Sequence, residues 1–221
     1  MLKLVDNRDS KSRGRKAVRV RVPPRPHSNF KSRTLRTTSA YIIGVALGDG
    51  NLSNPNTRAI RLRITYDTRY PRIQKEIRKN LQQLFPNNKI STIKRHRNFQ
   101  DISVYSNRLS ELLPWKTGRG SKFQQQAHVP SWIFKDKDCM RHCLRGLIQT
   151  DGSVYKDRGY LMVNFTNHTL RLARDVFTMM HQIGFNPTFH ETTASRQNKK
   201  YTVRLAKNPQ EFIDMIGLRK K

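Results

Sequence analysis

Cysteine and long apolar runs are both scarce in this sequence. The 221 residues contain two cysteines, and no run of eighteen apolar residues occurs, which excludes a membrane-spanning helix. Cys139 and Cys143 lie one helical turn apart and cannot form the disulfide framework of a secreted protein. His142 lies between them, but a structural zinc needs four ligands and no second cluster is present. We interpret both as reduced thiols, and the missing signal-peptide core predicts an intracellular protein, in the cytoplasm, nucleoid or an organelle matrix.

Acidic residues are also few. Aspartate and glutamate total 15 against 44 lysines and arginines, a formal net charge of +29. A compact body with this charge repels itself unless a polyanion neutralises it, which predicts a nucleic-acid partner. The alternative is a merely soluble or ribosomal-type basic protein. Residues 1–38 hold twelve of the basic residues and two aspartates, so we expect a flexible arm that lies along phosphates or is a solvated tail.

The rest of the sequence repeats one pattern twice. Apolar helices are predicted at 39–50 and 139–152, and alternating strands follow at 60–66 and 159–167. In each half an amphipathic helix, two strands and a last helix complete the order. The spacing between the halves is 102 residues, which indicates duplicated domains. We predict an α+β fold of two αββαββα halves, at 39–113 and 139–221, joined by a linker at 114–138.

Both apolar helices end in the same way, with "IIGVALGDG" and "LRGLIQTDG". Small residues four apart, such as Gly44 and Gly48, let two helix backbones approach closely. Asp49 and Asp151 then stand at the negative ends of their helix dipoles, where a carboxylate is unfavourable. A divalent cation removes this conflict, and carboxylates with carbonyls and water suit magnesium. We expect the glycine after each acid to take the left-handed conformation and end the helix. A lone Asp-Gly after a helix is usually only a turn, but two at matching places favour a metal site.

These two nonapeptides resemble the motif of the LAGLIDADG homing endonucleases, and "HVPSWIF" resembles the family's connector. The resemblance covers residues 39–217. It implies that the motif helices pack together and that each half offers a curved antiparallel sheet to the major groove. It also implies that Asp49 and Asp151 bind two or three magnesium ions, which calcium or manganese can replace, with the carbonyls of Gly48 and Thr150 as further ligands. Such an enzyme cuts both strands by in-line hydrolysis.

The family usually places a Gln or Lys just after the second strand of each half, and this sequence departs from that pattern. Thr65-Tyr66-Asp67 and Thr166-Asn167-His168 occupy those places. We therefore consider Asn167, His168, Lys94 and Lys200 as candidates for the catalytic surroundings. The candidates for DNA contact lie on the strand faces opposite the core and in hairpin tips: Arg58, Arg61, Arg63, Thr65, Lys94, Arg95, Arg97, Met162, Asn164, Thr166, Arg196, Lys199, Thr202 and Arg204. Arginine and asparagine can bond to bases, although at least half of such contacts reach only phosphate.

The sequence thus predicts a monomeric, intron-encoded endonuclease that makes a double-strand break in a long, partly palindromic duplex target. An RNA maturase that binds its host intron and cleaves DNA weakly or not at all is the main alternative, and the basic arm suits it. A transcription regulator on a degenerate version of the fold is a second, but both motif acids are kept and no helix-turn-helix is seen. An intein-embedded enzyme is a third, but no splicing-domain residues flank the chain.

Overall fold

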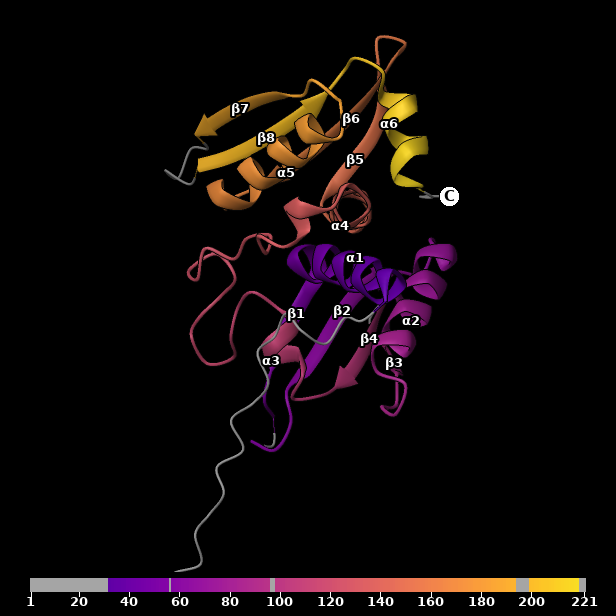
Figure 1. Ribbon diagram of the computed structural model, residues 1–221, viewed down its shortest axis with the longest axis vertical. Coiled ribbons are helices and arrows are strands. Elements are labelled where there is room, and N and C mark those ends of the chain that lie inside the picture. The colour runs from indigo at the N-terminus through magenta and orange to yellow at the C-terminus, as the bar shows by residue number, and fades with distance from the viewer. Residues whose placement is uncertain (1–31, 56, 96–97, 194–198, 219–221) are drawn as a thin grey trace, which may run out of the picture.

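The computed structural model describes residues 32–55, 57–95, 98–193 and 199–218 (Figure 1). The predicted arm lies outside the described residues except for its last seven. In the first half the elements are α1 (Arg33–Asp49), β1 (Gly50–Ser53), β2 (Arg61–Asp67), α2 (Pro71–Leu84), β3 (Ser91–Lys94), β4 (Phe99–Tyr105) and α3 (Leu109–Leu112). The second half has a 3-10 helix η1 (Ile133–Lys135), then α4 (Lys137–Thr150), β5 (Gly152–Asp157), β6 (Tyr160–Asn167), α5 (Leu170–Gln182), β7 (Thr188–Thr193), β8 (Lys199–Leu205) and α6 (Pro209–Ile216).

The two halves repeat one sheet topology, as predicted. Each forms a four-stranded antiparallel sheet, with strand order β1-β2-β4-β3 in the first half and β5-β6-β8-β7 in the second. On each sheet, alternate residues are buried, such as Leu62 and Ile64 on β2 and Val163 and Phe165 on β6. The buried stripes of α2 and α5 pack with these residues in one continuous core. The αββαββα prediction is therefore confirmed for both halves.

The centre of the molecule is the pair of helices α1 and α4, which lie between the two sheets (Figure 1). Every α1 residue from Thr38 to Leu47 is buried, because the helix has the first sheet on one side and α4 on the other. A Cβ atom on Gly44 would lie 2.2 Å from the carbonyl oxygen of Cys143, and one on Gly146 would lie 2.5 Å from that of Tyr41. The two backbones are thus in direct contact, as the small residues of the motifs predict.

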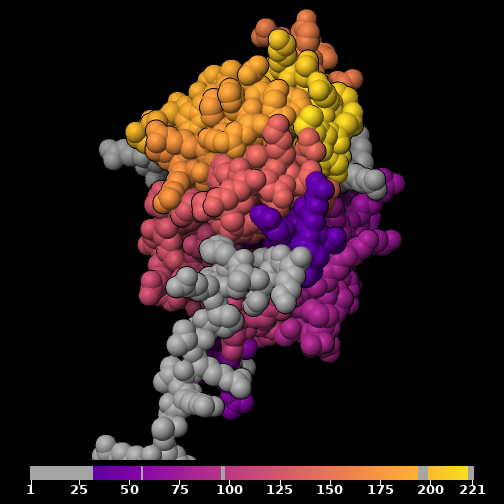
Figure 2. All heavy atoms as spheres, in the orientation of Figure 1, coloured from indigo at the N-terminus to yellow at the C-terminus, as the bar shows by residue number. Residues whose placement is uncertain are grey.

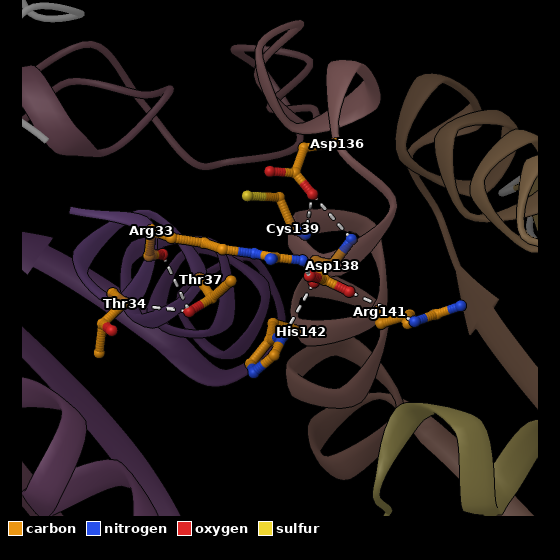
Figure 3. Close-up of polar contacts among 8 residues, drawn as sticks. All are labelled: Arg33, Thr34, Thr37, Asp136, Asp138, Cys139, Arg141 and His142. Atoms are coloured by element: carbon orange, nitrogen blue, oxygen red, sulfur yellow. Dashed lines mark hydrogen bonds and ion pairs between the residues drawn. The ribbon is translucent and has the colours of Figure 1, made fainter. Parts of the chain in front are cut away.

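Helix α1 begins six residues before the predicted start, at Arg33. Ser32 caps it, and its hydroxyl oxygen accepts a hydrogen bond from the backbone N–H of Leu35 at 3.2 Å. The predicted start was placed at the beginning of the apolar stretch, but the polar residues before that stretch belong to the same helix. They reach the beginning of α4, where the Arg33 guanidinium pairs with the Asp138 carboxylate (Figure 3).

Asp136 caps α4 at this same end of the helix pair (Figure 3). Its carboxylate accepts hydrogen bonds from the N–H groups of Asp138 at 2.9 Å and Cys139 at 3.4 Å. Cys139 and Cys143 are free thiols inside the helix, and burial raises the pKa of Cys139 to about 11. This end of the pair is therefore fastened by local capping and one ion pair, and the motif acids lie at the other end.

The prediction of left-handed glycines after the motif acids is wrong. Gly50 has φ −80° and ψ 144°, and Gly152 is likewise outside the left-handed region. Both glycines begin strands, β1 and β5. They are required for space, because a Cβ atom would lie 2.4 Å from the carbonyl oxygen of Ala46 or 2.6 Å from the Cα of Ile148. In each half, the glycine lets the chain leave the motif helix and enter the sheet directly.

Within the described residues, no helix is long and apolar enough to cross a membrane. The connecting segment between the halves has little regular structure. Figure 2 shows the two halves in direct contact, with this segment at the surface of their boundary. Its residues are nevertheless important for the site described below.

Candidate active centre at the ends of the motif helices

The two motif acids meet where α1 and α4 end. Asp49 is the last residue of α1 and is exposed, whereas Asp151 follows the last residue of α4 and is half-buried. The ends are close, because a Cβ atom on Gly48 would lie 2.0 Å from Thr150 Oγ1 and 3.5 Å from Asp151 Cγ. Two carboxylates and two helix C-termini thus concentrate negative charge in one place.

Asn167, one of the candidates for the catalytic surroundings, lies beside Asp151. Its side-chain amide donates a hydrogen bond to Asp151 Oδ2 at 2.9 Å. The amide oxygen in turn accepts from the N–H of Thr169 at 2.9 Å, which fixes the orientation of the group. His168 lines the same pocket, and its ring Nδ1 lies 3.0 Å from the carbonyl oxygen of Lys199.

Two pockets flank the helix ends, one for each acid. The Asp49 pocket is bounded by the end of β2, by α2 and by Gln149 and Thr150 from the end of α4. The Asp151 pocket is bounded by the end of β6, by α5 and by Leu47 and Gly48 from the end of α1. Each pocket thus combines its own acid with the end of the other motif helix.

Sequence reasoning missed the residue that most distinguishes the Asp151 pocket, Lys122. It comes from the connecting segment, and its ammonium donates to the carbonyl oxygens of Ala46 at 3.2 Å, Leu47 at 2.7 Å and Gly48. It also lies 5.6 Å from the ring centre of Trp115. Burial lowers the pKa of Lys122, and the charges of Asp151 and Asp49 oppose that shift. The sequence offers no signal for it, because lysines are common and this one is 29 positions before Asp151.

Of the other predicted basic candidates, neither Lys94 nor Lys200 is among the described residues that line these two pockets. Lys94 lies opposite Gln100 in the sheet, level with the buried Tyr66, and is therefore on the face that the helices cover. Lys200 lies opposite Thr192, on the face of β8 that also carries Thr202. The lysine that lines the Asp151 pocket therefore comes from the connecting segment and not from either predicted strand.

The Asp49 pocket is built on a polar network that crosses between the halves. The Tyr41 hydroxyl donates to Gln149 Oε1 at 2.8 Å, and the Gln149 amide donates to Glu76 Oε2 at 3.0 Å. Glu76 also pairs with Arg145 at 3.1 Å. At the rim of the pocket, Asp67 pairs with Arg69 at 2.6 Å, which lowers the pKa of the Asp67 carboxyl.

The donor set at the helix ends suits a hard divalent cation. Around Asp49 and Asp151 the available ligands are oxygens: two carboxylates and the terminal carbonyls of α1 and α4. Among the described residues, no group of three or more His, Cys, Asp or Glu side chains gathers for a metal, so the chain offers two motif carboxylates and carbonyl oxygens here. Magnesium usually keeps several waters and takes one or two carboxylates, which fits. The Gly48 carbonyl, predicted as a ligand, already accepts a hydrogen bond from Lys122.

The sheet faces opposite the core carry most of the residues predicted to contact DNA. Along β2 and β6 these residues alternate with buried ones, and the same alternation holds on β8. Those that follow the pattern are Arg61, Arg63, Thr65, Met162, Asn164, Thr166, Thr202 and Arg204. Arg58 lies in a turn before β2, and Lys199 pairs with Glu191 at 2.7 Å. Arg97 and Arg196 lie outside the described residues.

An acid within the first sheet face, Asp101, was not anticipated. Its side chain is fully buried and accepts hydrogen bonds from Thr65 Oγ1 at 2.7 Å and Arg95 Nε at 2.6 Å. Arg63 Nε lies 3.7 Å from the same carboxylate. Arg95 and Arg63 are partly exposed, so one buried charge holds two arginines at the surface of the sheet. The one sequence signal that could have found Asp101 is that an acidic residue lies within a strand of a strongly basic protein.

Comparison with known families gives a consistent assignment for both halves. A family model described as a LAGLIDADG-like domain matches residues 138–217, and one described as a WhiA LAGLIDADG-like domain matches residues 38–104. No curated protein matches the chain by sequence. Together with the fold and the paired motif helices, the two matches define the class: the chain is a two-motif member of the LAGLIDADG family.

Solved structures with the same fold include two kinds of protein. The homing endonuclease I-DmoI, in complex with DNA and manganese, is 18% identical with a TM-score of 0.60, covering 82% of this chain and 97% of its own. The N-terminal LAGLIDADG domain of DUF199/WhiA is 13% identical with a TM-score of 0.56, covering 88% and 89%. Full-length DUF199/WhiA from Thermatoga maritima is 14% identical with a TM-score of 0.55, covering 88% of this chain and 59% of that one. At these identities the likeness shows the fold.

Proposed function

We propose that this protein is a divalent-metal-dependent, site-specific DNA endonuclease that cuts both strands of a long duplex target. The observation that carries the proposal is the meeting of Asp49 and Asp151 at the ends of two helices in backbone contact. Clustered carboxylates at negative helix ends are unfavourable for packing alone and favourable for binding a cation. The similarity to I-DmoI, solved with DNA and manganese, supports the same assignment.

In this mechanism Asp49 and Asp151 would hold the metal ions, which when bound would help to form hydroxide and stabilise the charge at the scissile phosphate. The chain's own groups set the geometry. Asn167 holds the carboxylate of Asp151 by a hydrogen bond at 2.9 Å. The glycine contacts between α1 and α4 keep the two acids adjacent, so that the two strands of one duplex can be attacked at neighbouring places.

The two sheet faces are the proposed DNA-binding surfaces. If each covers about one helical turn, the target spans roughly 20 base pairs. The halves differ in side chains, with Arg61 and Arg63 on β2 where β6 has Met162 and Asn164, so the target should be only partly palindromic. The net charge of +29 predicts strong non-specific affinity that falls steeply with salt. One chain carries both halves, so we propose that it acts as a monomer, and we further propose that an intron encodes it.

Cleavage selection tests the proposal. The purified protein is incubated with a randomised duplex library, with magnesium or with calcium, and the new ends are sequenced. We expect magnesium-dependent cutting at one long, partly symmetric site. Asp49→Asn and Asp151→Asn should each abolish double-strand cutting and keep DNA binding. Asp136→Asn is the matched control, because it makes the same change at the other end of α4, where asparagine is an equally good cap.

A second candidate function is DNA binding without cleavage. It is favoured by Lys122, whose ammonium holds the terminal carbonyls of α1 where a metal ligand is expected. Specific retention of DNA with no cutting in either metal would establish this function and refute the endonuclease. Binding of structured intron RNA would then be measured, because a maturase of this fold is also expected to show little or no DNA cleavage.

A further inference from the structure

The first sheet has a buried carboxylate on the face that the helices do not cover. Asp101 on β4 lies opposite Thr65 on β2 and opposite Ile93 on β3. Cross-strand partners share a face of the sheet, so Asp101 points the same way as Thr65 and away from the buried side. Its side chain is nevertheless 0% exposed, so other side chains of the same face shield it from water. A carboxylate in such a place is unfavourable unless charges and hydrogen bonds compensate it.

Two arginines from different parts of the sheet provide that compensation. Arg95, which follows β3, donates from Nε to Asp101 Oδ2 at 2.6 Å, and Arg63 Nε on β2 lies 3.7 Å from the same oxygen. Both arginines present Nε to the acid, so these contacts do not use their terminal Nη groups. The Arg95 and Arg63 side chains are 46% and 30% exposed. One buried charge thus orients two neighbouring guanidinium groups at the surface of the sheet.

The second sheet has a neutral residue at the place that matches Asp101. Thr202 pairs with Thr166 there as Asp101 pairs with Thr65, and the two threonine hydroxyl oxygens lie 3.2 Å apart. Both sheets have the same strand order. A sheet of this topology therefore forms with a hydroxyl at this position, and the fold does not require a buried charge. This indicates that the charge of Asp101 serves what the two arginines do.

We propose that Asp101 is a positioning residue for base recognition, and that Arg63 and Arg95 each bond to a guanine in the first half of the target. Guanine presents O6 and N7 together in the major groove, and one arginine fork can bond to both. A guanidinium already held at Nε loses less freedom when its Nη groups bind a base. The nearby negative charge also weakens its attraction to phosphates, which carry no sequence information. The inference rests on the sheet faces that we propose as DNA-binding surfaces.

Binding selection measures this recognition without requiring cleavage. Each protein selects from a randomised duplex library in EDTA, at one fixed salt concentration, and the bound DNA is sequenced. Asp101→Asn removes the charge and keeps the size of the side chain. Asp101→Thr introduces the residue that the second sheet has at this place, and it covers the case in which asparagine prevents folding. Arg63→Lys and Arg95→Lys keep the positive charge and remove the fork.

Asp157→Asn is the matched control. Asp157 on β5 pairs with Arg204 at 3.1 Å, so the variant removes the same charge from an acid–arginine pair of the second sheet. That pair differs from the one at Asp101, because Asp157 is 47% exposed and bonds to a terminal nitrogen, Nη2. We therefore expect Asp157→Asn to leave the guanine preference in the first half of the target unchanged.

We expect the wild type to select guanine at two positions that the lysine variants identify, one position for each arginine. Asp101→Asn and Asp101→Thr should reduce the preference at both positions by about tenfold. Circular dichroism at the selection temperature shows whether each variant is folded. An unchanged guanine preference in a folded Asp101 variant would overturn the proposal. So would lysine variants that lose equal affinity for the selected target and for random DNA, because the arginines would then contact only phosphate.

The selection and the cleavage assay fail independently. If the wild type cuts no DNA with magnesium but selects guanines in a way that depends on Asp101, the endonuclease is refuted and this inference stands. If the wild type cuts its target and the Asp101 variants select the same sequence, the inference is refuted and the endonuclease stands. A wild type that selects no sequence at all would overturn the inference by itself.

Discussion

The contact between α1 and α4 can be tested by adding one methyl group at its centre. In Gly44→Ala the new Cβ would lie 2.2 Å from the carbonyl oxygen of Cys143. Ordinary contact distances are about 3.5–4.0 Å, so the two helices must move apart by roughly 1 Å or more. Both atoms belong to helices buried in the core, and no flexible side chain can yield. Because only backbone atoms are in the way, we take the upper end of the range for overpacking, about 3 kcal/mol, against a gain of about 1 kcal/mol in helix propensity.

We therefore expect Gly44→Ala to be destabilised by about 2 kcal/mol, which is a fall in melting temperature of roughly 4–8 °C for a domain of this size. Urea and thermal unfolding measure it. Lys75→Gly and Lys75→Ala, at an exposed position of α2, give the intrinsic difference between the two residues in this protein. A Gly44→Ala protein as stable as the wild type would refute the contact. DNA cutting should fall more than DNA binding, because the separation moves Asp49 away from Asp151.

Three further changes test other parts of the structure. Asp136→Ala should destabilise the protein by about 1 kcal/mol, because the start of α4 loses its cap, whereas Arg33→Ala, at an exposed ion pair, should leave the melting temperature unchanged within error. Tyr41→Phe should cost about 1–3 kcal/mol in urea unfolding, because the buried Gln149 oxygen loses its donor. Asp101→Asn should raise the affinity for random DNA at low salt and reduce the preference for the target. The reason is that the buried charge that holds Arg63 and Arg95 is lost. Fluorescence anisotropy at several salt concentrations measures both effects.

The fold was predictable because its signals are periodic. The alternation of Arg61, Leu62 and Arg63 gives the face of the strand directly, and the repeated small residues near Gly44 and Gly146 predict the helix contact. Helix starts were less accurate, because a cap such as Ser32 is one polar residue among many in a basic segment. The predicted conformation of Gly50 was wrong. The sequence shows that a glycine is needed there, but not whether the reason is a positive φ or the lack of space for a Cβ atom.

The site was predictable only where chemistry and repetition coincide. Asp49 and Asp151 stand at matching places in two copies, and Asn167 ends a predicted strand, so all three could be named as candidates from the sequence. Lys122 has no counterpart in the repeat and reaches the centre through a connector whose path no periodicity determines. Asp101 was missed for a related reason, since its arginine partners come from different strands and only the strand register brings them together.

The single connector also gives this architecture a freedom that a pair of identical chains lacks. An enzyme assembled from two identical chains presents the same groups to both strands of its substrate, so any change in one catalytic site occurs in the other. A fused gene has two copies of each half but one join, and the join is outside the symmetry. A residue such as Lys122 can therefore change without an equal change in the two repeated halves. On the proposed function, the connector is thus a part of the active centre that has no copy in the repeat.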